Sequence, residues 1–220
     1  MASGDAVRRR PRGERRRHEI LLAALGIVRE RGTAAVTHRA VAERAGVPPA
    51  TTTYYFDSID ELLEEALKLF VDDEVERLDQ LAANLRAASV SPHTISELFA
   101  EDLVRSGESG DNVAQFELYL EASRRPRLRE AAAACLKAYA GAAEAALSAG
   151  GAPRAAEGAR VFVALADGLA LARTAAPDVH DADTLARAMR DLFIAFAMDD
   201  DERAEWERRM SRPAAQRGRR

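Results

Sequence analysis

The chain has 220 residues, of which 47% are hydrophobic, and its formal net charge at pH 7 is −4. This length allows one small module and one substantial hydrophobic core. The single cysteine, Cys135, excludes an intrachain disulfide, and we expect it to be plain core in a reducing cytoplasm. No run of about 18 apolar residues exists, so we expect no membrane span, and the N-terminal arginines do not predict a secretory signal.

Charge is segregated along the chain. Residues 1–56 hold 11 arginines and 5 acidic residues, whereas residues 57–202 have a net charge of −15 and residues 203–220 one of +5. A basic end next to an acidic body is typical of a protein that binds a polyanion at one end only. Residues 1–13 are small, polar and rich in arginine, and we expect them to form a disordered basic arm.

The first helix is predicted from about residue 14 to residue 30, because apolar residues recur there at helical spacing. Gly32 then provides a stop signal. The residues expected in the buried stripe of this helix are Ile20, Leu21, Ala24, Leu25, Ile27 and Val28.

Residues 36–56 (VTHRAVAERAGVPPATTTYYF) predict two short helices folded about a glycine turn. Thr37 can cap the first helix through its hydroxyl, and Gly46 can end it in a left-handed conformation. The second helix, from Pro49 to about Tyr55, carries hydroxyls and phenols that suit phosphates, base edges and thymine methyls. This pair favours a fit to a DNA groove; the alternative is an ordinary helical hairpin with Thr and Tyr on its surface.

A fourth helix is predicted from Ser58, which can form a capping box with Glu61, to about residue 88. Such a helix can join the N-terminal head to the rest of the chain without a flexible linker. Glycine and proline breaks and a loop at residues 106–111 separate the helices that follow. These are expected at residues 91–106, 112–124, 126–149, 155–175 and 183–198.

A head with THRAVAERAGVPPATTTYYF, followed by DSIDELLEEAL at the start of a long helix, resembles the TetR-type family of bacterial transcriptional regulators. The resemblance is specific over about residues 14–70, and beyond them only the helical layout agrees. It implies an all-α fold in which a three-helix helix-turn-helix head is joined by a long fourth helix to a larger ligand-binding and dimerisation domain. It also implies a cytoplasmic homodimer that regulates transcription by binding double-stranded operator DNA, and a small-molecule effector that releases the protein from the operator.

On this basis the chain divides into the arm (1–13), the DNA-binding head (14–57), the effector-binding and dimerisation domain (58–199) and a charged tail (200–220). The resemblance places DNA-binding residues at His38, Arg39, Pro49, Ala50, Thr51, Thr53, Tyr54 and Tyr55. Thr52 is expected to face inward, and the ring of Tyr55 is expected to pack against the head.

Two positions depart from the family pattern. Thr53 stands where an aromatic residue is common, and Ile59 stands where a lysine is common, so one phosphate anchor is missing. We expect arginines near the N-terminus to replace it through counterion release or minor-groove contact. These are Arg8, Arg9, Arg10, Arg12, Arg15, Arg16 and Arg17.

The larger domain carries two further sets of candidate residues. Aromatic side chains that could line a ligand cavity, or simply fill the core, are Phe70, Phe99, Phe116, Tyr119 and Phe162. The two last main helices predict a dimer face, although the same stripes could complete the monomer's own core. Its residues are Val161, Leu165, Gly168, Leu169, Ala172, Leu185, Met189, Leu192, Phe193 and Phe196.

Other classes of protein explain the sequence less well. The chain has no HExxH, Cys-x-x-Cys, phosphate-binding glycine loop or GxSxG motif, so we expect no enzyme, no cofactor and no metal site. An architectural DNA-binding protein would need the basic ends but not the large acidic body. A helical interaction module without an effector is the other alternative, and binding to duplex DNA distinguishes it.

Overall fold

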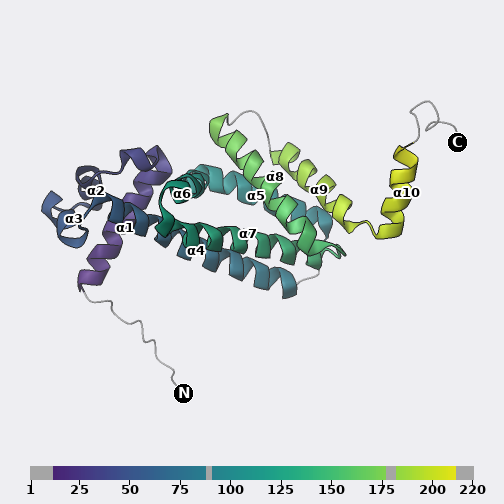
Figure 1. Ribbon diagram of the computed structural model, residues 1–220, viewed down its shortest axis with the longest axis horizontal. Helices are drawn as coiled ribbons and strands as arrows, with labels where there is room; N and C mark the ends of the chain where they lie inside the picture. Colours follow the sequence, from purple (N-terminus) through teal and green to yellow (C-terminus); the bar gives the residue numbers. More distant parts are fainter. Residues whose placement is uncertain (1–11, 88–90, 177–181, 212–220) are drawn as a thin grey trace, which may run out of the picture. The chain divides into compact units, whose positions relative to one another are not determined.

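The computed structural model describes residues 12–87, 91–176 and 182–211, which form helices joined by short connections (Figure 1). No strand occurs in these ranges, and the all-α prediction is confirmed. None of the helices in the described part of the chain is both long and apolar enough to cross a bilayer. In chain order the elements are α1 (Arg12–Arg31), η1 (Thr33–Ala35), α2 (His38–Ala45), α3 (Pro49–Tyr55), α4 (Ile59–Ala87), α5 (Pro92–Ser109), α6 (Asp111–Arg124), η2 (Pro126–Leu128), α7 (Arg129–Ala149), α8 (Ala155–Ala175), α9 (Ala182–Ala197) and α10 (Asp200–Met210).

One stretch differs from the sequence prediction, and the tail contains a helix around Trp206. The loop expected at residues 106–111 is wrong, because α5 continues to Ser109 and only Gly110 separates it from α6. A single glycine inside a helix, such as Gly107, costs only about 1 kcal/mol, which packing can outweigh. In the expected tail, Asp199 and Glu202 form a capping box that starts α10.

The described residues pack into two compact units. Residues up to 74 together with residues 109–134 form the first, and residues 75–108 together with those from 135 onward form the second. Helices α4 and α7 therefore contribute residues to both units. The first unit contains α6 as well as α1, α2 and α3.

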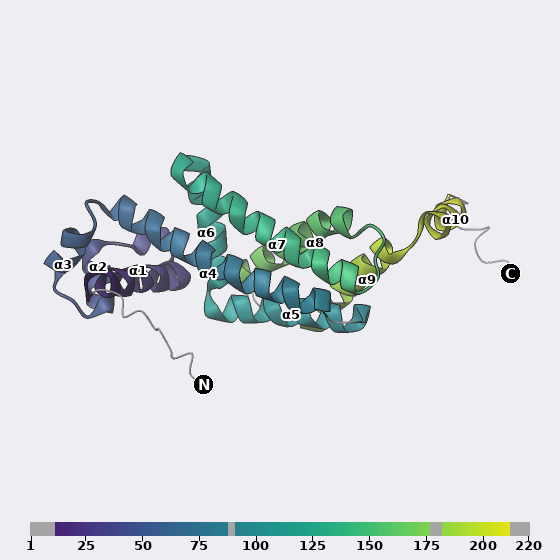
Figure 2. The ribbon, with the colours of Figure 1, turned by 90° about the horizontal axis from the view of Figure 1, so that it is seen from below.

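The predicted stripe of α1 forms the centre of the first unit. All six of its residues are buried, which confirms the helical periodicity of this segment. Val41 of α2, Phe56 after α3 and Leu62 of α4 are buried in the same unit. Figures 1 and 2 both show α2 and α3 beside α1.

Polar contacts join α6 to the end of α1 in the first unit. Thr33 Oγ1 donates to Glu117 Oε2 at 2.7 Å, and Arg29 Nη2 lies 2.7 Å from Asp111 Oδ1. Gly110 lies against Arg29: a Cβ added there would lie 2.7 Å from the Arg29 carbonyl oxygen, and its φ of +79° also favours glycine. These contacts tie the N-terminal half of α6 to the helix against which α2 packs.

A second link joins α2 to α1. Both terminal nitrogens of the Arg44 guanidinium donate to the two oxygens of Glu30, each at 2.7 Å. This hydrogen bonding lowers the pKa of the Glu30 carboxyl and raises the pKa of Arg44. Arg44 crosses α1 at Gly26, where an added Cβ would lie 2.6 Å from Arg44 Nε.

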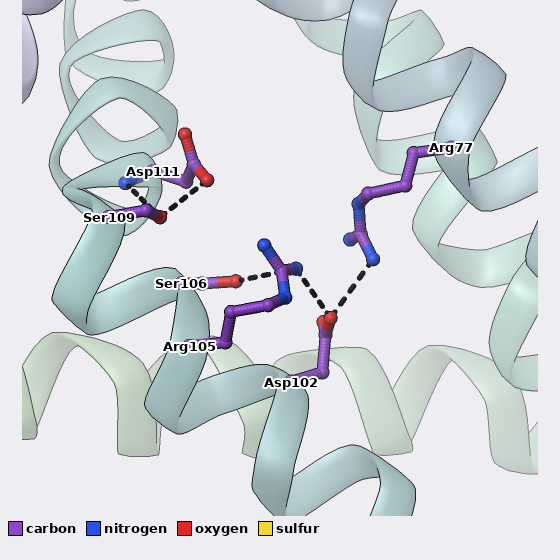
Figure 3. Close-up of polar contacts among 6 residues, drawn as sticks. All are labelled: Arg77, Asp102, Arg105, Ser106, Ser109 and Asp111. Atoms are coloured by element: carbon purple, nitrogen blue, oxygen red, sulfur yellow. Dashed lines mark hydrogen bonds and ion pairs between the residues drawn. The ribbon is translucent and has the colours of Figure 1, made fainter.

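In the second unit, α9 packs against the end of α7 and the start of α8. The ring of Phe193 fills the space beside Gly150, and the ring of Phe196 fills that beside Gly158, because an added Cβ would come within 3 Å of each ring. Arg77 of α4 and Arg105 of α5 both bind Asp102 Oδ1, at 2.9 and 2.6 Å (Figure 3). This shared carboxylate holds α4 and α5 together within the unit.

Candidate nucleic-acid interface

The turn between α2 and α3 has the geometry that the sequence predicts. Thr37 Oγ1 accepts a hydrogen bond from the Ala40 amide at 3.1 Å and so caps α2. Gly46 is left-handed (φ 64°, ψ 37°), and its amide donates to carbonyls of the last turn of α2. The Val47 amide donates to the Ala42 carbonyl at 3.0 Å, which completes the helix end.

Helix α3 begins with a proline at its first helical position, where the missing amide proton is no loss. The hydroxyls of Thr52 and Thr53 each donate to the carbonyl three residues earlier, at 2.9 and 3.1 Å. Thr52 is completely buried, as predicted, so only one side of α3 can face a partner.

That outer side carries most of the residues expected to contact DNA. Tyr54 stands out because 81% of its surface is exposed, which is unusual for an aromatic residue without a partner to bind. Exposed residues of the predicted set are Arg39, Pro49, Ala50, Thr53 and Tyr54, and half-buried ones are His38, Thr51 and Tyr55. The structure thus brings the eight residues together on the α2–α3 pair.

The two tyrosines differ in their surroundings. Their rings meet edge to face, with centroids 5.1 Å apart and an interplanar angle of 88°. A Cβ added at Gly13 would lie 3.8 Å from the Tyr55 hydroxyl, so the start of α1 lies next to the end of α3. The arm that precedes α1 is therefore attached at the edge of the surface expected to bind DNA.

The arginines predicted to act as an arm do not share one environment. Arg8, Arg9 and Arg10 lie outside the described residues, and Arg12 is the first residue of α1. Arg15 and Arg16 lie on α1 and form exposed ion pairs with Glu19.

Arg17 has a structural role instead. Its guanidinium lies 4.9 Å from the centroid of the Phe56 ring and forms an ion pair with Glu65 of α4. The prediction that Arg17 belongs to a DNA-binding arm is therefore wrong, since its charge is used to hold α4 on α1.

The start of α4 has Ile59 where a lysine is common in the family, but the acidic residues Asp60 and Glu61 beside it both have partners. Asp60 Oδ1 lies 2.9 Å from Arg125 Nη1, and Arg125 Nε lies 2.5 Å from Glu121 Oε2. Burial works against the charge of Arg125, but its hydrogen bonds to Asp60 and Glu121 outweigh this and raise the pKa of the guanidinium. The Asp57 amide donates to Glu61 Oε2 at 2.8 Å, and the Glu61 amide to Ser58 Oγ at 3.1 Å, which caps α4.

The predicted dimer residues do not share one surface. Met189, Phe193 and Phe196 are buried among the chain's own helices, so their assignment to an interface is wrong and they belong to its core. Amphipathic spacing shows that a face is buried but not what buries it. Val161 is 45% exposed and Gly168 is also exposed, whereas Leu165, Leu169, Ala172 and Leu192 are half-buried. The side chain of Leu185 lies outside the described residues.

The predicted ligand residues are divided between the two units. Phe70, Phe116 and Tyr119 belong to the first, where Phe70 is buried and Gln115 Nε2 donates to the Tyr119 hydroxyl at 3.1 Å. Phe162 is buried in the second unit. The side chain of Phe99 lies outside the described residues, and a ligand role for these five stays a prediction.

Comparison with known sequences gives matches to both parts of the chain. Residues 20–66 match the family described as bacterial regulatory proteins, tetR family, and residues 90–197 match the one described as tetracyclin repressor-like, C-terminal domain. The HTH-type transcriptional regulator BetI of Rhizobium meliloti (strain 1021) is 30% identical over 115 residues. These residues make up 52% of this chain and 55% of BetI, so the chain spans about half the length of that relative.

Solved structures match over a larger share of the chain. A transcriptional regulator from Streptomyces coelicolor A3(2) is 30% identical with a TM-score of 0.57, and the match covers 81% of this chain and 98% of that one. The multidrug binding protein EbrR, complexed with ethidium, is 30% identical with a TM-score of 0.56, over 80% of this chain and 97% of that one.

Replacing the exposed Arg39 by alanine should weaken binding to duplex DNA by about 10- to 100-fold, because a charged hydrogen bond to a phosphate or base is lost. The thermal midpoint should not change, since the side chain is on the surface. Fluorescence anisotropy with a labelled duplex measures the affinity. The charge-matched control is Arg86→Ala, which removes one exposed arginine from the C-terminal end of α4. Loss of folding in Arg39→Ala would refute the role assigned to Arg39.

Proposed function

Because the chain belongs to the TetR family of bacterial regulatory proteins, we propose that it represses transcription as a homodimer on a palindromic operator and is released by a small molecule. Regulation of transcription, with a DNA-binding part and a ligand-binding part, is common to the family. The observation that carries the proposal is the α2–α3 pair, whose outer side is lined by exposed Arg39, Thr53 and Tyr54.

Helix α3 is the element proposed to enter the major groove. It has seven residues, so a single head can read only a few base pairs. Two heads on one twofold axis would read two half-sites a helical turn apart, which supplies both affinity and a palindromic target. Arg39 at the start of α2 would contact phosphates or a guanine edge.

Exposed apolar residues of α8 and α9 support the dimer. Leu171 is 54% exposed and Ile194 is 47% exposed, and they accompany Val161 on the surface of the second unit. A Cβ at Gly168 would meet no atom within 4 Å, so this exposed glycine leaves room for close approach of another helix. We propose that these residues, together with half-buried Leu165, Leu169 and Leu192, form a four-helix interface with a second copy.

The proposed release depends on helices that belong to both units. A ligand that displaces the C-terminal half of α4 would move its N-terminal half, which is held to the head by Arg17 and Glu65. The Thr33–Glu117 and Arg29–Asp111 contacts would carry a shift of α6 to α1 in the same way. The ligand must prefer the form that does not fit DNA, because equal affinity for both forms shifts nothing.

Selection of bound duplexes from random DNA tests the DNA side of the proposal. We expect enrichment of a palindrome whose half-sites have centres about 10 base pairs, or a multiple of that, apart. Sedimentation of the complex should give two chains per duplex. Enrichment of a single half-site by one chain, or binding without sequence preference, would favour the architectural alternative.

Removing residues 1–11 tests the arm. The deletion takes away Arg8, Arg9 and Arg10, and it should reduce the slope of log affinity against log salt by about 2 to 3, at one counterion per lost phosphate contact. The matched control replaces Arg217, Arg219 and Arg220 by alanine, which removes three charges from the other end. An unchanged slope in the deletion would reject a DNA-binding arm.

Because the chain is similar to EbrR, which was solved with ethidium, ethidium is the probe for ligand binding and release. Ethidium should raise the thermal midpoint of the protein alone; it is not used with DNA, because it also inserts between base pairs. Non-intercalating compounds that compete with ethidium should then release the selected operator duplex in an anisotropy assay. A protein that binds its operator but that no bound compound releases would contradict effector control.

A further inference from the structure

His38 and Thr52 form a hydrogen bond that joins the two helices of the DNA-binding pair. His38 is the first residue of α2, and its Nδ1 lies 3.1 Å from Thr52 Oγ1 in α3. Thr52 is completely buried and His38 is half-buried, so this edge of the imidazole faces inward. The opposite edge of the ring carries Nε2.

The second hydrogen bond of Thr52 favours one of the two neutral forms of His38. A hydroxyl has one hydrogen to donate, and Thr52 donates it to the Pro49 carbonyl oxygen at 2.9 Å. Towards His38 the hydroxyl oxygen can then only accept. In this arrangement Nδ1 is the protonated nitrogen, and the neutral imidazole has its lone pair on Nε2.

We propose, resting on the proposed function, that Thr52 is a positioning residue that makes His38 Nε2 a hydrogen-bond acceptor for DNA. In the major groove the only base-edge donors are the exocyclic amino groups of adenine N6 and cytosine N4. His38 therefore reads one amino group per half-site. Guanine and thymine present acceptors and a methyl group at the same edge, and these cannot pair with a lone pair.

A phosphate contact fits this arrangement less well. Phosphate oxygens are acceptors, and two acceptors repel each other. The neighbouring Arg39 is exposed, and a guanidinium offers only hydrogen-bond donors, so it is the better phosphate ligand. At the start of α2, His38 thus contacts a base edge and Arg39 contacts the phosphate backbone of the DNA.

Selection from random DNA is repeated with His38→Ala, Thr52→Val and Thr52→Ser. Valine matches threonine in shape without the hydroxyl, whereas serine keeps it. In the wild type one base pair of each half-site should show a preference on the order of tenfold for a given amino group. His38→Ala and Thr52→Val should lose the preference at that base pair and keep the others, and Thr52→Ser should retain it. Uniform weakening over all sequences in His38→Ala would identify a phosphate contact and overturn the inference.

Two-bond proton–nitrogen NMR of the free protein, at a pH where His38 is neutral, reads the tautomer directly. The wild type and Thr52→Ser should show the proton on Nδ1, and Thr52→Val should shift it towards Nε2. A wild type with the proton on Nε2 would overturn the inference even if valine at position 52 prevents folding. A wild type that selects no duplex but has the proton on Nδ1 refutes the proposed function and with it the reading of bases, while the tautomer control by Thr52 stands.

Discussion

The left-handed turn at Gly46 is the constraint on which the DNA-binding surface depends. It reverses the chain between α2 and α3, and in this arrangement His38 Nδ1 lies 3.1 Å from Thr52 Oγ1. A Cβ at Gly46 would meet no atom within 4 Å, so the requirement comes from the backbone and not from crowding. Any residue with a side chain would be strained there by about 1 kcal/mol, and asparagine least.

The three N-terminal helices pack together with a helix from much later in the chain. Helix α6 belongs to the same compact unit, and it is held there by contacts between residues far apart in the sequence. Arg125 reaches Asp60 at the start of α4, and Glu117 reaches Thr33 after α1. In the proposed mechanism, a shift of the α2–α3 pair would therefore involve a helix that lies in the middle of the chain.

Local signals explain which features could be predicted from the sequence. The cap at Thr37, the turn at Gly46 and the buried stripe of α1 follow from neighbours within a few residues, and the structure confirms them. The α2–α3 surface also follows once the turn is known, because α3 is short and Thr52 points inward.

The failed predictions concern contacts that no local pattern encodes. Phe193 and Phe196 have the spacing of a dimer stripe, yet the absence of side chains at Gly150 and Gly158 makes room for their rings inside the chain. Arg17 looks like one more arginine of a basic arm, but it is the residue that reaches Phe56. Neither partner lies near enough in sequence for spacing to identify it.

The absence of a side chain at Gly26 leaves room for the ion pair between Arg44 and Glu30. Any side chain at this position would meet the guanidinium of Arg44, and since this is the free end of a flexible side chain it would swing aside at little cost. That movement would disturb the paired hydrogen bonds between Arg44 and Glu30, which join α2 to α1. A substitution at Gly26 would thus loosen the tie between α1 and the helix that carries Arg39, without altering any residue expected to contact DNA.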